Sequence, residues 1–262
     1  MQLETIVVGI ILATMAVYAA AWITLLTGRE RTGLLLFGAG WIMNAGLVAL
    51  NWIAGGHPPF GNMYHVLIFL SLCFLPAYIV LRLKDRIAWL AVYFAFVSVI
   101  PLLGALFMET DILWSRAPAL QSPWFVPHVV AYVISYSLAA VAFALTVAGI
   151  FRRKGARVFE RYTEASYHTI RLAFPFMTFG LCSGALWAEE AWGVYWSWDP
   201  KETWSLITWL LYIIYFHCRT KPSLMKYAIP AQALAFIALL TTFLLVNLLP
   251  KLSSVLHSYA MM

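Results

Sequence analysis

The chain has 262 residues, of which 63% are hydrophobic and 11% are charged, and its formal net charge is +6. Soluble domains carry about 25% charged residues, so this composition, with a mean hydropathy of +0.83, excludes an ordinary water-soluble protein and predicts an integral membrane protein. The positive charge does not call for a nucleic-acid partner, because basic residues at a membrane rim meet the anionic lipids of the bilayer.

Eight apolar runs follow one another along the chain, and each is close to the roughly 20 residues that a spanning helix needs. Lipid forces backbone groups to satisfy their own hydrogen bonds, so continuous runs of this length predict helices rather than strands. We therefore predict an all-α, polytopic membrane helix bundle of about eight transmembrane helices, forming one domain over residues 1–262. The runs cover about residues 5–27, 33–54, 62–81, 87–107, 127–151, 172–190, 200–218 and 227–249. A further amphipathic surface helix is expected around RYTEASYHTIRLAF, before the sixth run.

Basic residues gather in alternate connections between these runs. Of the 17 Lys and Arg residues, only Arg116, Lys201 and Lys251 lie on the other side of the predicted bundle. Cytoplasmic loops carry the excess of Lys and Arg in membrane proteins, so both termini are predicted to lie outside.

The three cysteines, Cys73, Cys182 and Cys218, are scattered within the predicted helices. None belongs to a C-x-x-C pair, so a disulfide framework, a zinc site and a redox dithiol are not expected. The sequence also contains no C-x-x-C-H segment to which haem would be attached covalently.

Residues 192–204, WGVYWSWDPKETW, combine aromatic rings with three charged residues. Asp199, Pro200 and Glu202 fit the N-cap, N1 and N3 positions at the start of a helix. Two interpretations of the rings remain open at this point. They form an interfacial aromatic belt, or they form a shelf for a large flat molecule such as a porphyrin, a quinone, a sterol or a lipid tail.

Two histidines from separate segments are predicted to reach the outer face that carries this loop, namely His128 and His257. Neutral imidazole is a common axial ligand of haem iron, so the pair favours a porphyrin. His217 lies within the seventh predicted helix, where polar groups are costly and often functional. The alternatives are helix capping or water binding for an interfacial histidine, and snorkelling toward the basic rim for His217. His168 is expected only on the surface helix.

The run LWAEEAWGVYWSWDPKETWSLITWLLYIIYFH, residues 186–217, closely resembles the tryptophan-rich WWD signature of the haem-handling superfamily that includes CcmC and CcmF. Within that superfamily it is most similar to the CcsA/ResC type of cytochrome c biogenesis protein. The segments GGHPPFGNMYHVLIFL, AFPFMTFG and VNLLPKLSSVLHSYA also resemble blocks of that family.

The resemblance implies a haem-binding component of cytochrome c maturation that moves or presents haem b, iron protoporphyrin IX, at the outer face of the membrane. The acceptor would be an apocytochrome c with a C-x-x-C-H segment. A CcsB-like membrane protein would be the partner in a cytochrome c synthase, or haem lyase. The membrane would be the bacterial inner membrane or the thylakoid membrane, with the WWD loop, about residues 187–204, on the periplasmic or lumenal side.

By the same resemblance, His128 and His257 match the two external ligands of the haem iron, and His217 matches the histidine of a second haem site in the membrane. His65 departs from the family, which commonly has Glu in an N-x-Y-E pattern, and it is an extra candidate ligand. No catalytic residue is assigned, because no nucleophile and base pair is evident. The haem-stacking residues of the WWD loop would be Trp192, Tyr195, Trp196, Trp198, Asp199, Lys201 and Trp204.

Two alternatives remain beside this interpretation. One is a CcmC-like subunit that delivers haem to a haem chaperone; the count of eight spans and the LHSY segment disfavour it. The other is a cytochrome b-type subunit for quinone binding and electron transfer. That design commonly places two histidines on the same helix, and no predicted helix has such a pair.

Overall fold

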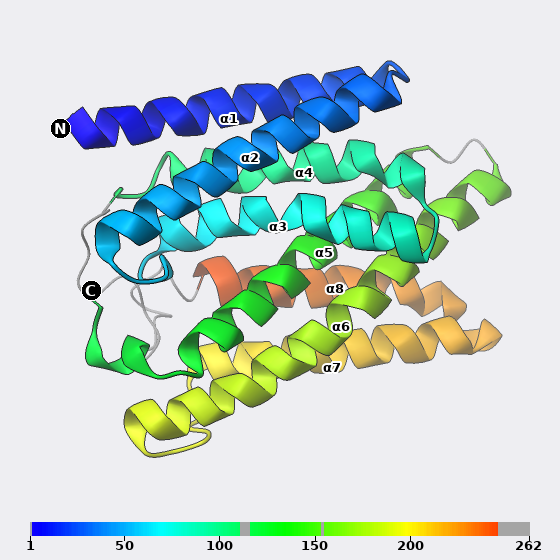
Figure 1. The fold of residues 1–262 in the computed structure, drawn as a ribbon. Coiled ribbons are helices and arrows are strands. Elements are labelled where there is room, and N and C mark those ends of the chain that lie inside the picture. Colours follow the sequence, from blue (N-terminus) through cyan, green and yellow to red (C-terminus); the bar gives the residue numbers. More distant parts are fainter. Residues whose placement is uncertain (1, 111–115, 153–154, 246–262) are drawn as a thin grey trace. The chain divides into compact units, whose positions relative to one another are not determined.

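The computed structural model describes residues 2–110, 116–152 and 155–245, and the regular elements in these ranges are all helical (Figure 1). The described part contains eight α-helices, and seven helical segments in it are long and apolar enough to cross a membrane. The prediction of an all-α, polytopic membrane bundle is therefore confirmed. His257 and Lys251 lie outside the described residues.

The chain divides into two compact units, and the first is built from four helices together with Tyr167–Thr169. Helix α1 packs along α2, and α4 contacts both α1 and α3 (Figure 1). Their bounds are Gln2–Leu26 for α1, Glu30–Gly55 for α2, Met63–Lys84 for α3 and Ala91–Ala105 for α4. A short 3-10 turn, Ala88–Leu90, leads into α4.

Buried polar side chains in the first unit bond to the backbone of the neighbouring helix. The Asn44 amide donates to the Ile68 carbonyl at 3.2 Å, and the Trp41 indole donates to the Leu72 carbonyl at 3.0 Å. The Ser71 hydroxyl donates to the Ser98 carbonyl at 2.7 Å. A polar group in an apolar interior is costly unless it is bonded, so these contacts fix how α2, α3 and α4 pack.

The second unit contains the remaining helices, and in it α7 runs alongside α8 (Figure 1). The bounds are Phe125–Phe151 for α5, Ala156–Trp192 for α6, Pro200–Thr220 for α7 and Ala228–Leu240 for α8, which continues as a π-helical turn over Thr241–Leu245. Short 3-10 turns, Pro118–Gln121 and Pro222–Tyr227, precede α5 and α8. The division into two compact units does not test whether residues 1–262 form one functional domain, so that expectation stays a prediction.

Helices α5 and α6 pack antiparallel through glycines that bring the two helices close together. A Cβ on Gly149 would lie 2.8 Å from the Cβ of Tyr162, and a Cβ on Gly180 would lie 2.9 Å from the Tyr132 ring. Helix association in membranes relies on small residues of this kind, because lipid tails supply no hydrophobic driving force.

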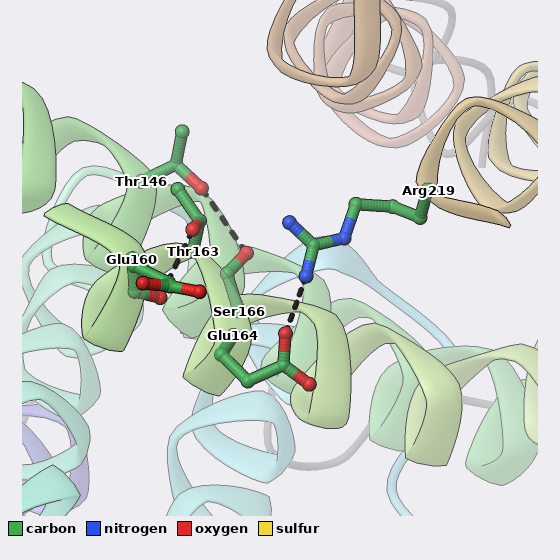
Figure 2. A network of polar contacts seen from close by, with 6 residues as sticks. All are labelled: Thr146, Glu160, Thr163, Glu164, Ser166 and Arg219. Carbon is green, nitrogen blue, oxygen red and sulfur yellow. Dashed lines mark hydrogen bonds and ion pairs between the residues drawn. The ribbon is translucent and has the colours of Figure 1, made fainter. Parts of the chain in front are cut away.

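A buried polar chain links α5, α6 and α8. The Thr146 hydroxyl donates to Gln232 Oε1 at 2.8 Å, and Gln232 Nε2 donates to the Ser166 hydroxyl oxygen at 2.8 Å. Figure 2 shows the Thr146 and Ser166 hydroxyls facing one another, with their oxygens 3.1 Å apart. The same view shows the ion pair of Arg219 and Glu164, which connects α7 to α6. These bonds hold four helices in a fixed register.

Two separate helices were expected in the region of α6, namely a surface helix and then a span over residues 172–190. Helix α6 is instead one continuous helix of 37 residues, roughly 55 Å long at about 1.5 Å per residue, whereas the hydrocarbon core of a bilayer is about 30 Å thick. No glycine or proline interrupts its amphipathic first half, and Pro175 is accommodated within the helix. The periodicity of this region was therefore interpreted correctly, but the expected boundary between the two segments was wrong.

Candidate functional site

The WWD loop connects α6 to α7, and both of its ends are fixed by helix caps. Gly193 follows α6 with a left-handed φ of 76°, and its N–H donates to the Glu189 carbonyl at 2.7 Å. At the start of α7, Asp199 Oδ1 accepts the Glu202 N–H at 2.8 Å, and Glu202 Oε2 accepts the Asp199 N–H at 3.3 Å. The predicted capping box is confirmed.

His128 lies in the first turn of α5 and faces α6. Its Nδ1 is 2.8 Å from the Gly180 carbonyl oxygen. A carbonyl only accepts, so Nδ1 carries the proton, and the lone pair of the neutral ring is then on Nε2. The close approach depends on Gly184, because a Cβ there would lie 2.6 Å from Cε1 of the His128 ring. Helix α6 thus determines the orientation and the tautomer of this imidazole.

Aromatic rings surround His128 within the second unit. Tyr132 meets the imidazole edge-on at 5.1 Å, and the Trp187 ring lies 5.4 Å away at an interplanar angle of 31°. Trp187 in turn contacts Trp192 at 4.9 Å and Phe125 at 5.3 Å. Trp192 is therefore connected to His128 through Trp187, and all three rings lie in one aromatic cluster.

The segment before α5 holds this cluster in place. The Trp187 indole donates to the Ala119 carbonyl at 2.7 Å, and the Ser122 hydroxyl donates to Glu190 Oε2 at 2.6 Å. Both bonds connect the last turns of α6 to residues that directly precede α5. They hold the end of α6, which carries Trp187, against the segment before α5.

A second ring pair lies farther along the loop. Trp196 and Trp198 meet edge-on, with centroids 5.8 Å apart and an interplanar angle of 85°. The Trp198 side chain is 68% exposed and Tyr195 is 58% exposed, so the other described residues leave much of both rings uncovered. In the described part of the chain, the Trp196 indole N–H is buried and makes no hydrogen bond. The loop thus offers exposed ring faces beside a buried hydrogen-bond donor.

Lys201 and Trp204 lie in the first turns of α7 and are both half-buried. His217 is exposed near the other end of the same helix, roughly 25 Å along α7 from Pro200 at about 1.5 Å per residue. The structure therefore places the loop residues at one end of α7 and His217 at the other. The expected second ligand, His257, lies outside the described residues.

His65 belongs to the first unit, in the first turn of α3. It is fully buried, and its backbone N–H donates to Asn62 Oδ1 at 2.9 Å, which caps the helix. His168 has an ionic partner, because its Nδ1 lies 3.0 Å from Asp85 Oδ1. Its position on a helix was expected, and its pairing with Asp85 was not.

The sequence analysis missed several residues that shape the His128 site. Phe125 and Tyr132 stand three residues before and four residues after His128, so they share its face of the helix, and this spacing could have identified them. Gly180 and Gly184 are spaced by four residues, which is the small-residue spacing of close helix pairs in membranes. The pairing of α5 with α6 was needed to connect these glycines to His128.

A protein-family model described as "Cytochrome C assembly protein" matches residues 60–253, a range that includes His128 and the whole WWD loop. The chain is 34% identical over 244 residues to the cytochrome c biogenesis protein CcsA of Chlamydomonas reinhardtii, covering 81% of this chain and 64% of that protein. It is 31% identical over 251 residues to CcsA of Mesostigma viride, covering 81% of each. CcsA of Gloeothece citriformis is 32% identical over 281 residues, covering 82% of this chain and 83% of the relative.

Proposed function

Because the chain belongs to the cytochrome c assembly protein family, we propose that it binds haem at the outer face of the membrane and presents it for covalent attachment to apocytochrome c. The family and the apolar helices make the chain an integral membrane protein with a role in cytochrome c maturation. The proposal adds haem as the substrate, the residues that hold it, and the side of the membrane.

The hydrogen bond between His128 and Gly180 is the observation that carries the proposal. Histidines that bind metals commonly donate their second ring N–H to a backbone carbonyl or a carboxylate, which fixes the tautomer and raises the basicity of the ligating nitrogen. The 2.8 Å contact of Nδ1 has this form, and it supports Nε2 of His128 as the proposed ligand of the haem iron. His257, by resemblance, supplies the second axial ligand.

The WWD loop fits the porphyrin itself. Its exposed rings, Tyr195 and Trp198, provide apolar faces for a flat macrocycle. The buried indole N–H of Trp196 is a donor suited to a propionate carboxylate, and Lys201 offers a positive charge in the adjacent turn. Trp192, at the start of the loop, contacts Trp187 and so belongs to the His128 cluster.

The attachment reaction requires positioning more than acid or base chemistry from this chain. Each cysteine S–H of the acceptor's C-x-x-C-H segment adds across one haem vinyl group, so that one S–C bond and one C–H bond form and nothing leaves. A chain that holds the vinyl edge toward the acceptor supplies the orientation that accelerates such an addition. This agrees with a site of rings and histidines in which no nucleophile is assigned.

The remaining predicted residues and partners belong to the same proposal. His217 marks a second haem position in the membrane, at the end of α7 away from the loop, and His65 is an additional candidate ligand in the first unit. A CcsB-like membrane protein completes the synthase. The loop faces the periplasm or the lumen, in a bacterial inner membrane or a thylakoid membrane.

The test is the haem content and absorbance spectrum of the purified protein and of the variants His128→Ala and His257→Ala. Each variant is expected to lose the low-spin bis-histidine spectrum and to attach less haem to a C-x-x-C-H peptide in the presence of a CcsB-like partner. His168→Ala is the control, since that histidine pairs with Asp85 instead. Wild-type haem content and a wild-type spectrum in both variants would refute the ligand assignment.

A further inference from the structure

We propose that Glu202 is a positioning residue that holds Trp198 in a left-handed backbone conformation and thereby presents the Trp198 ring as a stacking surface for a planar aromatic macrocycle. The choice of a macrocycle as the ligand rests on the function proposed above. The effect of Glu202 on the backbone of Trp198, called the backbone clamp below, does not. This role differs from helix capping, which is the local explanation for Glu202 in the sequence.

The backbone of Trp198 is unusual for a residue of its size. Its φ is +59°, and among the described residues only Arg86 shares a positive φ without being glycine. This region is sterically unfavourable for side chains with a Cβ, and strained residues of this kind cluster at functional sites. The same loop uses glycine for its other left-handed position, Gly193, where φ is 76°. A loop that needed only the turn would be expected to have glycine at 198 as well.

Glu202 accepts hydrogen bonds from the backbone N–H groups of both residues that flank Trp198. Its Oε2 accepts the Ser197 N–H at 2.8 Å and the Asp199 N–H at 3.3 Å. A capping box needs only the second of these bonds, yet the shorter bond goes to Ser197, outside that motif. A carboxylate is a strong acceptor, so the pair of bonds can offset the strain at Trp198.

A third contact closes the arrangement from the carbonyl side. The Thr203 hydroxyl donates to the Trp198 carbonyl oxygen at 3.2 Å, and the Ser197 hydroxyl adds a 3.3 Å contact to Glu202 Oε2. The peptide groups around Trp198 are therefore held by two residues of the first turn of α7. The helix start and the backbone conformation of the loop are therefore one structure, and the first turn of α7 holds the backbone from which the ring projects.

The backbone clamp leaves the ring of Trp198 largely uncovered by the described residues. The side chain is 68% exposed, and Trp196 meets it edge-on at 85°, so Trp196 does not stack on its face. The strained backbone of Trp198 works against the stability of the loop. A contact between the exposed ring face and a flat ligand would explain the strained conformation. Because the backbone of Trp198 is already held in place, the ligand would bind without a further entropic cost of ordering this residue.

The backbone half of the proposal is tested without any ligand, by comparing the melting temperatures of Trp198→Gly and Trp198→Ala. Both variants lack the ring, but only glycine adopts a left-handed conformation without a steric cost. The glycine variant is expected to melt about 2–6 °C higher than the alanine variant. At an ordinary loop position alanine is the more stable of the two, so the reverse order, or equal values, would overturn the assignment.

The ligand half is tested with iron-free protoporphyrin IX, which needs no axial histidine, titrated into the detergent-purified protein and followed by its Soret absorbance. Trp198→Gly and Glu202→Ala are each expected to weaken binding by about two- to tenfold, the value of one aromatic contact. Trp198→Phe keeps a ring and should restore most of the affinity.

The double variant separates action through Trp198 from an independent role of Glu202. If Glu202 acts through the ring, adding Glu202→Ala to Trp198→Gly causes no further loss of affinity, whereas independent effects multiply and contradict the proposal. Glu160→Ala is the control, because it also removes a carboxylate, but an exposed one in the second turn of α6, at the end of that helix away from the loop, and it should leave porphyrin affinity unchanged. A wild-type protein that binds neither haem nor iron-free porphyrin would refute the proposed function, while equal porphyrin binding by the wild type and the Trp198 variants would refute only this inference.

Discussion

The imidazole of His128 is oriented by two glycines of α6 that act in different ways. Gly180 contributes the carbonyl that accepts from Nδ1, and Gly184 contributes the space in which the ring lies. A ligand role for a histidine at this position could be predicted from the sequence, but the choice of nitrogen depends on a contact between residues 52 positions apart.

A methyl group added at Gly184 is expected to displace the His128 ring. In Gly184→Ala the new Cβ would lie 2.6 Å from Cε1 and 2.7 Å from Nδ1, so the ring must move and its bond to Gly180 breaks. We expect a loss of about 1–3 kcal/mol in unfolding free energy, as for overpacked cores, together with a changed haem spectrum.

The matched control for this change is Gly46→Ala, which also adds a methyl group to a helical glycine. Nothing lies within 4 Å of the added Cβ at this position, so stability should be unchanged or slightly higher. Wild-type stability and a wild-type haem spectrum in Gly184→Ala would contradict the tight fit of His128 against α6.

At the scale of elements, α6 is the helix to which the rest of the second unit is attached. It contacts α5 through the close glycines, α8 through Ser166 and Gln232, and α7 through Glu164 and Arg219. Because α6 is long, its first half makes the polar bonds to α7 and α8, and its second half contains the glycines that contact His128. A shift of α6 along its axis would therefore change the site and the polar chain together.

The polar chain should show energetic coupling between α5 and α8. Thr146→Val and Gln232→Leu each remove a buried partner and are expected to cost about 0.5–1.5 kcal/mol, the range measured for hydrogen bonds between membrane helices. The double variant should cost less than the two losses added together, because the first change already breaks their shared bond. Unfolding in detergent and denaturant measures each value.

Thr163→Val is the control for that cycle. Its hydroxyl donates to the Glu160 carbonyl within α6 at 3.0 Å, as Figure 2 shows, and it makes no bond to another helix in the described residues. It should change stability by less than either of the other substitutions. Additive losses in the double variant of Thr146 and Gln232 would show that the two side chains are not coupled.

For the molecule as a whole, the distribution of basic residues predicts the orientation in the membrane. The connections rich in Lys and Arg should face the cytoplasm, which places the WWD loop outside. The outer side is also the side on which the proposed acceptor, apocytochrome c, would meet the loop. The predicted orientation follows from charge alone and is independent of the haem assignment.

Two exposed serines near opposite ends of α7 allow a direct test of the orientation. Ser197→Cys and Ser223→Cys make the same chemical change at positions that are both exposed. In a variant without the native cysteines, a membrane-impermeant maleimide added to intact cells should label Cys at 197 and not at 223, and permeabilisation should expose the second. Labelling of 223 alone in intact cells would invert the topology.

The sequence by itself determined that the protein lies in a lipid bilayer, that it is helical, where the helix at Asp199 begins and to which family it belongs. Each of these depends on local composition or on a short motif. Apolar runs of spanning length have few structural solutions in lipid, so the membrane bundle could be predicted without knowing any contact. The same local character explains why the capping box was predicted correctly.

Only the tertiary structure decided the continuity of α6, the seat of His128 between two glycines, and the second role of Glu202. Each depends on contacts that composition does not encode: a carbonyl 52 residues away, a missing Cβ opposite a ring, or a carboxylate that reaches beyond its own helix. The loop sequence thus predicted a surface for a flat ligand, whereas the contact between α5 and α6 determined which ring nitrogen of His128 is bonded to the backbone and which is left for another partner.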